Sequence, residues 1–297
     1  MKVLRGRTAF VTGAASGIGR AIALRLAREG VNLVLTDRSA DGLAATMRDA
    51  QALGVSATSA VCDLTRPADI SAMLEQHFAD APLHILVNCA GLTWFGHQHS
   101  APRDMWQDVM AVNLLAPMQI TTELLPRLLA ADEAHIVNVA SMLGVAPGRK
   151  LVAYTASKHG LVGFTMAMRA DYHRSYFGLS AICPGFVKTP MLALEGACET
   201  GGSHPTIPDW LSTTPDHIAE VALDAIRRDR GLVLVTAAAK LLWWLNRLSP
   251  ALLDYLNREG WRQRGRIDPA PPAGAGSDRA AITLQDADQR QDRRARH

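Results

Sequence analysis

Short apolar runs alternate along the chain with segments in which apolar residues recur every three or four positions. The runs at 8–12 and 31–36 predict the first two strands, and Ile18, Ile22 and Leu26 give the segment between them a helical stripe. This alternation predicts an α/β fold, a doubly wound parallel sheet of about seven strands with helices on both faces. Further strands are predicted at 55–61, 83–88, 134–140, 178–183 and 231–236, and further helices at 39–53, 67–79, 103–130, 153–176 and 215–228.

Residues 238–262 form a predicted amphipathic helical extension beyond the last strand. Ser249 and Pro250 suit the N-cap and first position of a further helix that ends near Gly260. The extension carries a stripe of leucines: Leu241, Leu245, Leu248, Leu252 and Leu256. This stripe can pack on the domain or on a sister subunit, lie in a membrane interface through residues 240–257, or cover a substrate pocket. We expect one domain over 1–237, then the extension, then a disordered tail over 263–297.

Composition narrows the class of protein. Of the 297 residues, 48% are apolar and 20% are charged, which fits a globular chain and excludes a collagen-like or wholly disordered one. The net charge is +3, and residues 262–297 hold eight Arg and five Asp, so the globular part is neutral and shows no sign of nucleic-acid binding. The four cysteines form no CxxC pair, which indicates reduced thiols in a cytoplasmic protein. We expect neither a membrane-spanning helix nor a secretory signal.

A glycine-rich turn joins the first predicted strand to the first predicted helix. It reads Thr12-Gly13-Ala14-Ala15-Ser16-Gly17-Ile18-Gly19, and its glycines permit positive φ and close approach of a ligand to the backbone. The N-terminus of the following helix offers free N–H groups to a pyrophosphate. Strand, glycine turn and helix in this order predict dinucleotide binding, with contacts from Gly13, Ser16, Gly17, Ile18 and Gly19.

The residue at the end of the second strand bears on which dinucleotide binds. Asp37 stands 24 residues after Gly13, where a carboxylate accepts hydrogen bonds from ribose hydroxyls and repels a 2′-phosphate. This favours NAD over NADP, although Arg38 follows directly and could attract a 2′-phosphate. Asp63 and Leu64, after the third strand, are candidate neighbours of the adenine, and the alternative for Asp63 is a helix cap.

Further polar motifs stand at or after the ends of later elements. They are Asn88-Cys89-Ala90-Gly91, Asn113, Ser141, Tyr154-x-x-x-Lys158 and Pro184-Gly185. Together with the glycine turn, this set resembles the single-domain short-chain dehydrogenase/reductase family over residues 5–237. The resemblance implies a Rossmann-like fold and an NAD(P)-dependent oxidoreductase. Cys89 departs from the family pattern, in which a second Asn is usual at this position.

Tyr154 and Lys158 can also be interpreted from their chemistry. They stand four residues apart on a predicted helix, so both side chains leave one face. A free tyrosine, with a pKa of about 10, is a poor base at neutral pH, and an adjacent ammonium group lowers that pKa. Ser141, 13 residues before Tyr154, can hydrogen-bond a substrate oxygen and stabilise its developing charge.

The resemblance implies a role for each of these residues. Tyr154 is the general acid/base, Lys158 also holds the nicotinamide ribose, and Ser141 polarises the carbonyl. Asn113 supports a water that connects Lys158 to solvent. Further contacts to the cofactor are implied for Asn88, Ala90, Gly91, Pro184, Gly185, Val187 and Thr189.

One loop after the fourth strand contains a different kind of signal. His97 and His99 look like a metal-binding pair, but no third ligand with useful spacing accompanies them, so we expect no metal. We interpret the pair as part of a loop near the substrate. Trp94 and Phe95 in the same loop either contact the substrate or pack in the interior.

We therefore predict a NAD(H)-dependent oxidoreductase that interconverts a secondary alcohol and a ketone, with an apolar substrate. The alternatives are a NADP-dependent carbonyl or 3-oxoacyl reductase, and a non-catalytic nucleotide-binding or membrane-associated scaffold. The family usually assembles through two long helices, here 103–130 and 153–176, so the resemblance implies a homodimer or homotetramer. We expect a cytoplasmic protein, possible contact with a membrane surface through 240–257, and no nucleic-acid partner.

Overall fold

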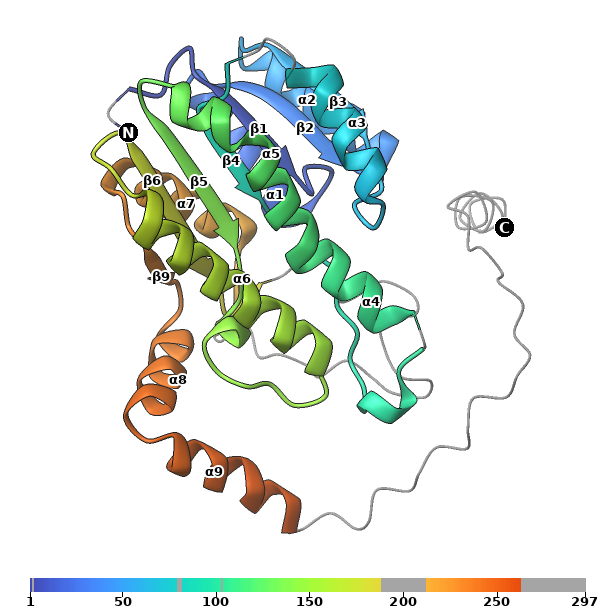
Figure 1. The fold of residues 1–297 in the computed structure, drawn as a ribbon, viewed down its shortest axis with the longest axis vertical. Helices are drawn as coiled ribbons and strands as arrows, with labels where there is room; N and C mark the ends of the chain where they lie inside the picture. The colour runs from blue at the N-terminus through green and yellow to red at the C-terminus, as the bar shows by residue number, and fades with distance from the viewer. Residues whose placement is uncertain (2, 79–81, 103, 188–211, 263–297) are drawn as a thin grey trace, which may run out of the picture. The chain divides into compact units, whose positions relative to one another are not determined.

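The computed structural model describes residues 1, 3–78, 82–102, 104–187 and 212–262. Within them, a parallel sheet runs in the strand order β3-β2-β1-β4-β5-β6-β9 (Figure 1). A separate two-stranded pair, β7 (Phe186–Val187) and β8 (Ser212–Thr213), follows the exit of β6. The predicted doubly wound α/β fold is confirmed. The strands of the large sheet are β1 (Thr8–Thr12), β2 (Asn32–Asp37), β3 (Ala57–Val61), β4 (Ile85–Asn88), β5 (Ala134–Val139), β6 (Phe177–Cys183) and β9 (Leu232–Leu234).

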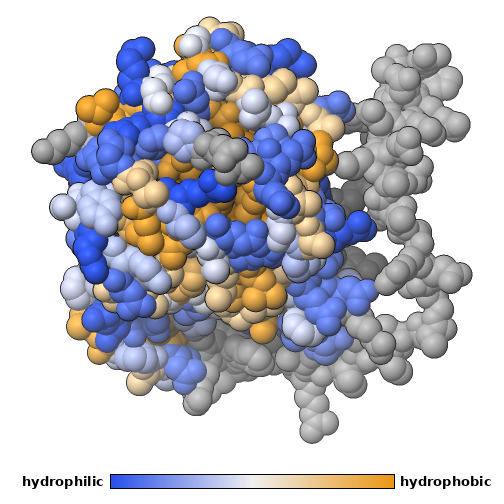
Figure 2. Space-filling model, turned by 45° about the horizontal axis from the view of Figure 1, so that its top comes forward, coloured by the Kyte–Doolittle hydropathy of each residue, from blue (hydrophilic) through white to orange (hydrophobic). Residues whose placement is uncertain are grey.

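Helices cover both faces of the sheet. One face packs against α1 (Gly17–Arg28) and α7 (Pro215–Arg228), and the other against α3 (Pro67–Phe78) and α5 (Ala116–Ala130). Phe10 and Val11 of β1 point to opposite faces, because Phe10 joins the core under α3 and α5 whereas Val11 joins the core under α1 and α7. On the side of the molecule seen in Figure 2, hydrophilic residues separate the apolar areas. The other helices of the main fold are α2 (Ala40–Ala52), α4 (Met105–Met110) and α6 (Val152–Tyr172).

A π-helical turn interrupts the helix that the sequence predicts over 103–130. The turn covers Ala111–Leu115 and connects α4 to α5. Its i→i+5 hydrogen bonding accommodates one more residue than an α-helical turn. The interruption lies at Asn113, whose side chain is fully buried. The expectation of one uniform α-helix is therefore wrong at this point, because apolar spacing does not distinguish the two kinds of turn.

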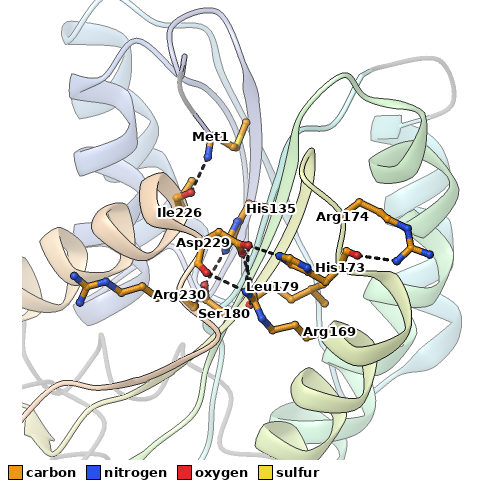
Figure 3. Close-up of polar contacts among 10 residues, drawn as sticks. All are labelled: Met1, His135, Arg169, His173, Arg174, Leu179, Ser180, Ile226, Asp229 and Arg230. Carbon is orange, nitrogen blue, oxygen red and sulfur yellow. Dashed lines mark hydrogen bonds and ion pairs between the residues drawn. The ribbon is translucent and has the colours of Figure 1, made fainter.

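Side chains and one special backbone conformation define the two ends of α7. The Thr214 hydroxyl accepts a hydrogen bond from the His217 amide and so caps the N-terminus of the helix. The helix ends at Asp229, whose φ of 50° is left-handed. The Asp229 carboxylate accepts hydrogen bonds from Arg169 of α6 and from His173 (Figure 3). These contacts tie the end of α6 to the end of α7.

Two helices follow β9, α8 (Ala237–Leu248) and α9 (Pro250–Arg262). One expected arrangement had the leucine stripe of these helices packed on the domain. The structure differs, because α8 contacts the domain through other residues. Trp243 contacts the buried cluster that contains Val145 and Leu161, and Asn246 Nδ2 donates to the Val145 carbonyl oxygen at 2.9 Å. In the described part of the chain, no helix has the length and apolar character needed to cross a membrane. The stripe leucines that lie exposed are Leu241, Leu248, Leu252 and Leu256.

Candidate active site

The glycine turn after β1 is too closely packed for larger residues. Gly13 has a φ of 70°, and a Cβ there would lie 2.8 Å from the backbone of Ala90. A Cβ on Gly19 would lie 2.1 Å from the Gly13 carbonyl oxygen. Gly17, with a φ of 53°, begins α1, and the side chain of the N-cap residue Ser16 makes no capping hydrogen bond. Ser16 thus leaves the first amides of α1 accessible to an anion, and this cradle fits a pyrophosphate.

Thr12, at the end of β1, opens the glycine turn, but no role was predicted for its side chain from the sequence. Its Oγ1 accepts hydrogen bonds from the Cys89 amide at 3.0 Å and from the Ala90 amide at 3.1 Å. This contact holds the turn after β4 beside the glycine turn, although 77 residues separate Thr12 from Cys89. Because the contact uses the Cys89 backbone, the unusual Cys at this position leaves the turn intact. The nearest signal in the sequence was a hydroxyl residue directly before the glycine turn.

Asp37 lies next to the glycine turn, as predicted from its place at the end of β2. Its Oδ2 accepts a hydrogen bond from the Ala15 amide at 3.1 Å, and its Oδ1 accepts one from the Ser39 amide at 3.1 Å. The residue is half-buried, and the Arg38 side chain beside it is exposed. A carboxylate is therefore fixed beside the glycine turn, and its contact with an adenosine ribose stays a prediction.

Asp63 closes a local turn that precedes Pro67, the first residue of α3, so it does not serve as the helix cap of its alternative interpretation. Its Oδ1 accepts hydrogen bonds from the Thr65 amide at 3.0 Å and from the Thr65 hydroxyl at 2.8 Å, just before α3. Burial works to raise the pKa of Asp63, but the hydrogen bonds from Thr65 and the charge of Arg66 outweigh it and lower the pKa. The local turn thus accounts for one carboxylate oxygen of Asp63, and its contact with adenine stays a prediction.

Ser141 and Tyr154 are brought together from the end of β5 and the first turn of α6. The Ser141 side chain lies close enough to the Tyr154 hydroxyl to lower its pKa, and the Ser141 Oγ accepts the Leu143 amide at 3.1 Å. Burial raises the pKa of Tyr154 above its ordinary value of 10, and the Ser141 side chain offsets only part of this. The lowered pKa expected for Tyr154 is therefore wrong for this arrangement, because burial was not visible in the sequence.

Lys158 lies on the same face of α6, one turn after Tyr154. Its side chain is 3% exposed, and its Nζ lies 5.8 Å from the centroid of the Tyr154 ring. The Nζ donates a hydrogen bond to the Val139 carbonyl oxygen at 2.8 Å. Burial lowers the pKa of Lys158 to about 8. The pair predicted from its spacing is thus assembled, with the ammonium directed to the end of β5.

Asn113 is held between the turn after β4 and α6. Its Oδ1 accepts the Leu92 amide at 2.7 Å, and its Nδ2 donates to the Leu92 carbonyl oxygen at 2.9 Å. The Nδ2 also donates to the Ser157 hydroxyl at 3.1 Å. Ser157 in turn donates to the Tyr154 carbonyl oxygen at 2.8 Å, and the sequence pattern did not single it out. Asn113 is therefore linked to Tyr154 through Ser157, and its other hydrogen bonds join the backbone of Leu92.

The segment after β6 also meets the site. The Pro184 carbonyl oxygen accepts the Met142 amide at 2.7 Å, which joins this segment to the residues after Ser141. A Cβ on Gly185 would lie 2.5 Å from the Thr236 hydroxyl, so glycine permits this approach. Val187 is half-buried in β7 and packs against the core under α1 and α7. Thr189, the last predicted contact, lies outside the described residues.

Several predicted cofactor residues contribute to the interior. Asn88 is 2% exposed and donates from Nδ2 to Asn138 at 2.8 Å, whereas its Oδ1 has no hydrogen-bond partner within the described structure. Leu64 is buried in the core under α3 and α5, and Ile18 is half-buried against the opposite core. Gly91 is half-buried beside Ala90. Their contacts with a dinucleotide stay predictions.

The two aromatic residues of the loop after β4 differ in how far they are buried. Trp94 is 7% exposed and therefore packs in the interior, whereas Phe95 is half-buried with the Lys150 Nζ 5.7 Å from its ring centroid. The rings of His97 and His99 stack with 5.5 Å between centroids. Among the side chains that the structure describes, no group of three or more His, Cys, Asp or Glu is arranged to hold a metal ion.

This combination of fold and residues matches a known family. The short chain dehydrogenase family matches residues 7–199, which is more than half of the chain. The protein is a member of the short-chain dehydrogenase family. As such, it is an oxidoreductase that acts on CH–OH groups with a nicotinamide dinucleotide. The resemblance stated from the sequence motifs is confirmed.

Individual short-chain dehydrogenases match four fifths or more of the chain. The 1-deoxy-11-beta-hydroxypentalenate dehydrogenase of Streptomyces avermitilis is 33% identical over 80% of this chain and 87% of its own length. The ketoacyl reductase HetN of Nostoc sp. is 31% identical over 87% of this chain and 90% of its own. A crystal structure of a short-chain dehydrogenase/reductase from Burkholderia phymatum in complex with NAD has a TM-score of 0.71 and 26% identity. That likeness covers 91% of this chain and 100% of the other.

Proposed function

We propose that this short-chain dehydrogenase interconverts a secondary alcohol and a ketone, with NAD(H) as its cofactor. The observation that carries the proposal is the proximity of Ser141 to Tyr154, with the Nζ of Lys158 5.8 Å from the centroid of the Tyr154 ring. Nicotinamide, when bound, takes up a hydride in alcohol oxidation and supplies one in ketone reduction. The glycine turn at 13–19 and Asp37 would hold the dinucleotide.

Tyr154 holds the proton of the reacting oxygen. In oxidation its phenolate oxygen accepts the hydroxyl proton of the alcohol, and in reduction its phenol returns a proton to the carbonyl oxygen. Ser141 donates a hydrogen bond to the same oxygen and stabilises the charge that develops on it. A positively charged Lys158 beside the ring would favour the phenolate form of Tyr154.

The preference for NAD follows from Asp37. Its carboxylate, fixed by the Ala15 and Ser39 amides, would accept hydrogen bonds from the ribose hydroxyls and repel a 2′-phosphate. We expect kcat/KM to be at least ~10-fold higher with NAD(H) than with NADP(H), and Asp37→Ser to reduce or reverse this ratio. A ratio that already favours NADP(H) in the wild-type enzyme would contradict the preference.

A NADP-dependent carbonyl or 3-oxoacyl reductase is the second candidate. Two observations favour it: the exposed Arg38 beside Asp37, and the ketoacyl reductase activity named for the Nostoc relative. The same assay distinguishes the candidates if 3-oxoacyl thioesters are tested beside cyclic, aromatic and steroidal alcohols. Met142, Leu143 and Leu151 flank the catalytic pair and would give the pocket an apolar wall, which supports an apolar substrate.

Tyr154→Phe is the test of the catalytic assignment. It removes the proton-carrying hydroxyl and leaves the ring, so we expect turnover to fall by a factor of about 10² or more while cofactor binding persists. Wild-type turnover of the best substrate by Tyr154→Phe would contradict the proposed role of Tyr154. A scaffold that binds the cofactor without chemistry would show no turnover with either dinucleotide.

We also propose that the enzyme forms a homodimer or homotetramer in the cytoplasm. Large apolar side chains are exposed along α4, the π-helical turn, α5 and α6, which supports an interface on these helices. The thiols of Cys62, Cys89 and Cys183 are free, which suits a reducing compartment. Leu115→Glu should lower the mass measured by light scattering if the interface lies there. The exposed side chains are Trp106, Leu115, Met118 and Val152.

A further inference from the structure

The outer side of the C-terminal extension is unusually apolar. The exposed residues recur three, four or seven positions apart within each helix, so each set lies on one side of its helix. Soluble proteins rarely leave so many neighbouring large apolar side chains in water unless the surface contacts something else. We name this set the C-terminal apolar surface; its members, with exposed fractions, are Leu241 (61%), Trp244 (51%), Leu248 (74%), Leu252 (43%), Tyr255 (55%) and Leu256 (53%).

The inner side of α8 is fixed to the body of the enzyme, so the apolar surface cannot turn inward without breaking contacts. The Thr236 hydroxyl caps the helix at the Ala239 amide, and Ala239 is fully buried. Trp243 packs against the cluster around Val145, and Asn246 hydrogen-bonds the Val145 carbonyl oxygen. α8 therefore presents its apolar side outward as a consequence of how its other side is held.

The charge of this part of the chain indicates what the surface meets. Residues 237–262, which form α8 and α9, contain four basic residues and two acidic ones, a net charge of +2. In a two-fold symmetric contact between copies, two pairs of helices that each carry a net positive charge would face each other. Anionic lipid headgroups attract a positively charged segment. The basic residues are Lys240, Arg247, Arg258 and Arg262, and the acidic ones are Asp254 and Glu259.

We infer that α8 and α9 bind the surface of an anionic lipid bilayer, with the C-terminal apolar surface inserted at the level of the headgroups. Helices of 12 and 13 residues are about 18–20 Å long, sufficient to lie in the interface though not to cross it. Trp244 and Tyr255 carry both an apolar ring and a polar group, the combination found at membrane interfaces. This inference goes beyond the proposed function, because it would hold with either cofactor and with any substrate.

Binding in this way would place the active site beside the lipid. Asn246 and Trp243 connect α8 to Val145, which lies four residues after Ser141. An alcohol or ketone dissolved in the bilayer would then reach the enzyme at its local concentration in the membrane. The enzyme would work on such substrates better with vesicles present than without them.

Flotation of the full-length protein with vesicles tests the inference. We expect the wild type to float with vesicles of phosphatidylglycerol and phosphatidylcholine, to float poorly with phosphatidylcholine alone, and to dissociate at high salt because salt screens the charges. Leu241→Gln/Leu248→Gln should reduce the partition coefficient about tenfold or more. The matched control is Val3→Gln/Leu53→Gln, which changes two apolar residues that are 58% and 43% exposed elsewhere. The control should float like the wild type.

Light scattering and turnover of a water-soluble alcohol complete the experiment. The inference predicts that Leu241→Gln/Leu248→Gln keeps the wild-type mass and turnover while it loses flotation. A smaller assembly with unchanged flotation would overturn it and show instead that the surface joins copies of the chain. A wild-type protein that stays with the soluble fraction in every vesicle mixture would overturn it as well. Turnover, measured separately, shows whether the proposed function fails on its own.

Discussion

The ammonium nitrogen of Lys158 donates a hydrogen bond to the carbonyl oxygen of Val139, 2.8 Å away. This bond ties α6 to the end of β5, two residues before Ser141. Lys158 is almost fully buried, and burial lowers its pKa from 10.5 to about 8. Removing a charged ammonium group from water costs free energy, and one hydrogen bond to the backbone compensates only part of that cost. We therefore expect Lys158 to lower the free energy of unfolding.

Lys158→Met should therefore stabilise the protein at neutral pH while it abolishes turnover. The fall in the pKa of Lys158 from 10.5 to about 8 corresponds to a cost of about 3 kcal/mol for burying the charged form. The variant avoids this cost but loses the hydrogen bond to Val139, which reduces its gain in stability by about 1 kcal/mol. Because the folded pKa is the lower one, this cost is fully present below pH 8 and disappears as the pH rises towards 10.5. Urea unfolding at pH 7 and pH 9.5 checks the expectation. Lys240→Met, at an exposed lysine, is the control; equal stability changes for both variants would contradict it.

Ser141→Ala should shift the pH dependence of alcohol oxidation upward. The Ser141 side chain lowers the pKa of Tyr154 against the larger effect of burial, so its loss leaves the pKa of Tyr154 higher still. Oxidation requires the phenolate, so the rise of kcat/KM with pH should move to higher pH. The rate at the optimum should fall by a factor of about 10² to 10³. Ser141→Thr keeps the hydroxyl and should keep the wild-type pH dependence of kcat/KM. An unshifted pH dependence in Ser141→Ala would contradict the proposed effect of Ser141 on the pKa of Tyr154.

Gly19→Ala should disrupt the dinucleotide site. Its Cβ would lie 2.1 Å from the Gly13 carbonyl oxygen, so the turn must move, at a cost of about 1–3 kcal/mol. Fluorescence titration with NADH should show binding at least ~10-fold weaker. Gly163→Ala is the control, because a Cβ on this glycine of α6 meets no atom within 4 Å. Gly163→Ala should instead stabilise the protein by about 0.5–1 kcal/mol and leave binding unchanged.

Asp229→Asn should destabilise the fold in a pH-dependent way. Burial works to raise the pKa of Asp229, but hydrogen bonds from Arg169 and His173 outweigh it and lower the pKa. The resulting stability is present above the ordinary pKa of 3.8 and is lost as the pH falls through the lower folded value. Because Asp229 is partly exposed, we expect a cost of about 1–2 kcal/mol at pH 7 that shrinks towards pH 3.

The Asp229 variant has a matched control in Asp49→Asn. Asp49 pairs with Arg20 on the surface, where both side chains are about half exposed, so its loss should cost less than about 1 kcal/mol. Asn accepts the left-handed backbone at residue 229, so the comparison isolates the charge. Urea unfolding of both variants at pH 7 and pH 4 provides the measurement. A larger effect at Asp49 than at Asp229 would refute the expected role of the contacts in Figure 3.

The elements of the fold follow from local patterns, and most bounds agree within two residues. The helix expected over 215–228 coincides with α7, because Thr214 and Pro215 mark its start unambiguously. The proximity of Ser141, Tyr154 and Lys158 was also predictable, since parallel strands end at one edge of the sheet and a spacing of four places two side chains on one helix face. The catalytic and cofactor roles, and the domain limits at 237 and 262, stay predictions.

Other features depend on contacts that no local pattern contains. Thr12 reaches the Cys89 amide across 77 residues, and such a partner is known only once the strands are in place. The direction of the Tyr154 pKa depends on burial, which opposes the effect expected from Lys158. The leucine stripe shows that one side of the extension is apolar, but amphipathic spacing does not say what covers that side.

The π-helical turn at Ala111–Leu115 makes the length of this segment as important as its composition. Deleting one residue from the turn would restore regular α-helical geometry and rotate α4 by about 100° relative to α5. Asn113 would then leave the Leu92 backbone, even if every remaining residue kept its identity. Point changes at the exposed positions of α4 and α5 are therefore expected to accumulate during evolution, whereas insertions and deletions between the two helices are expected to be eliminated.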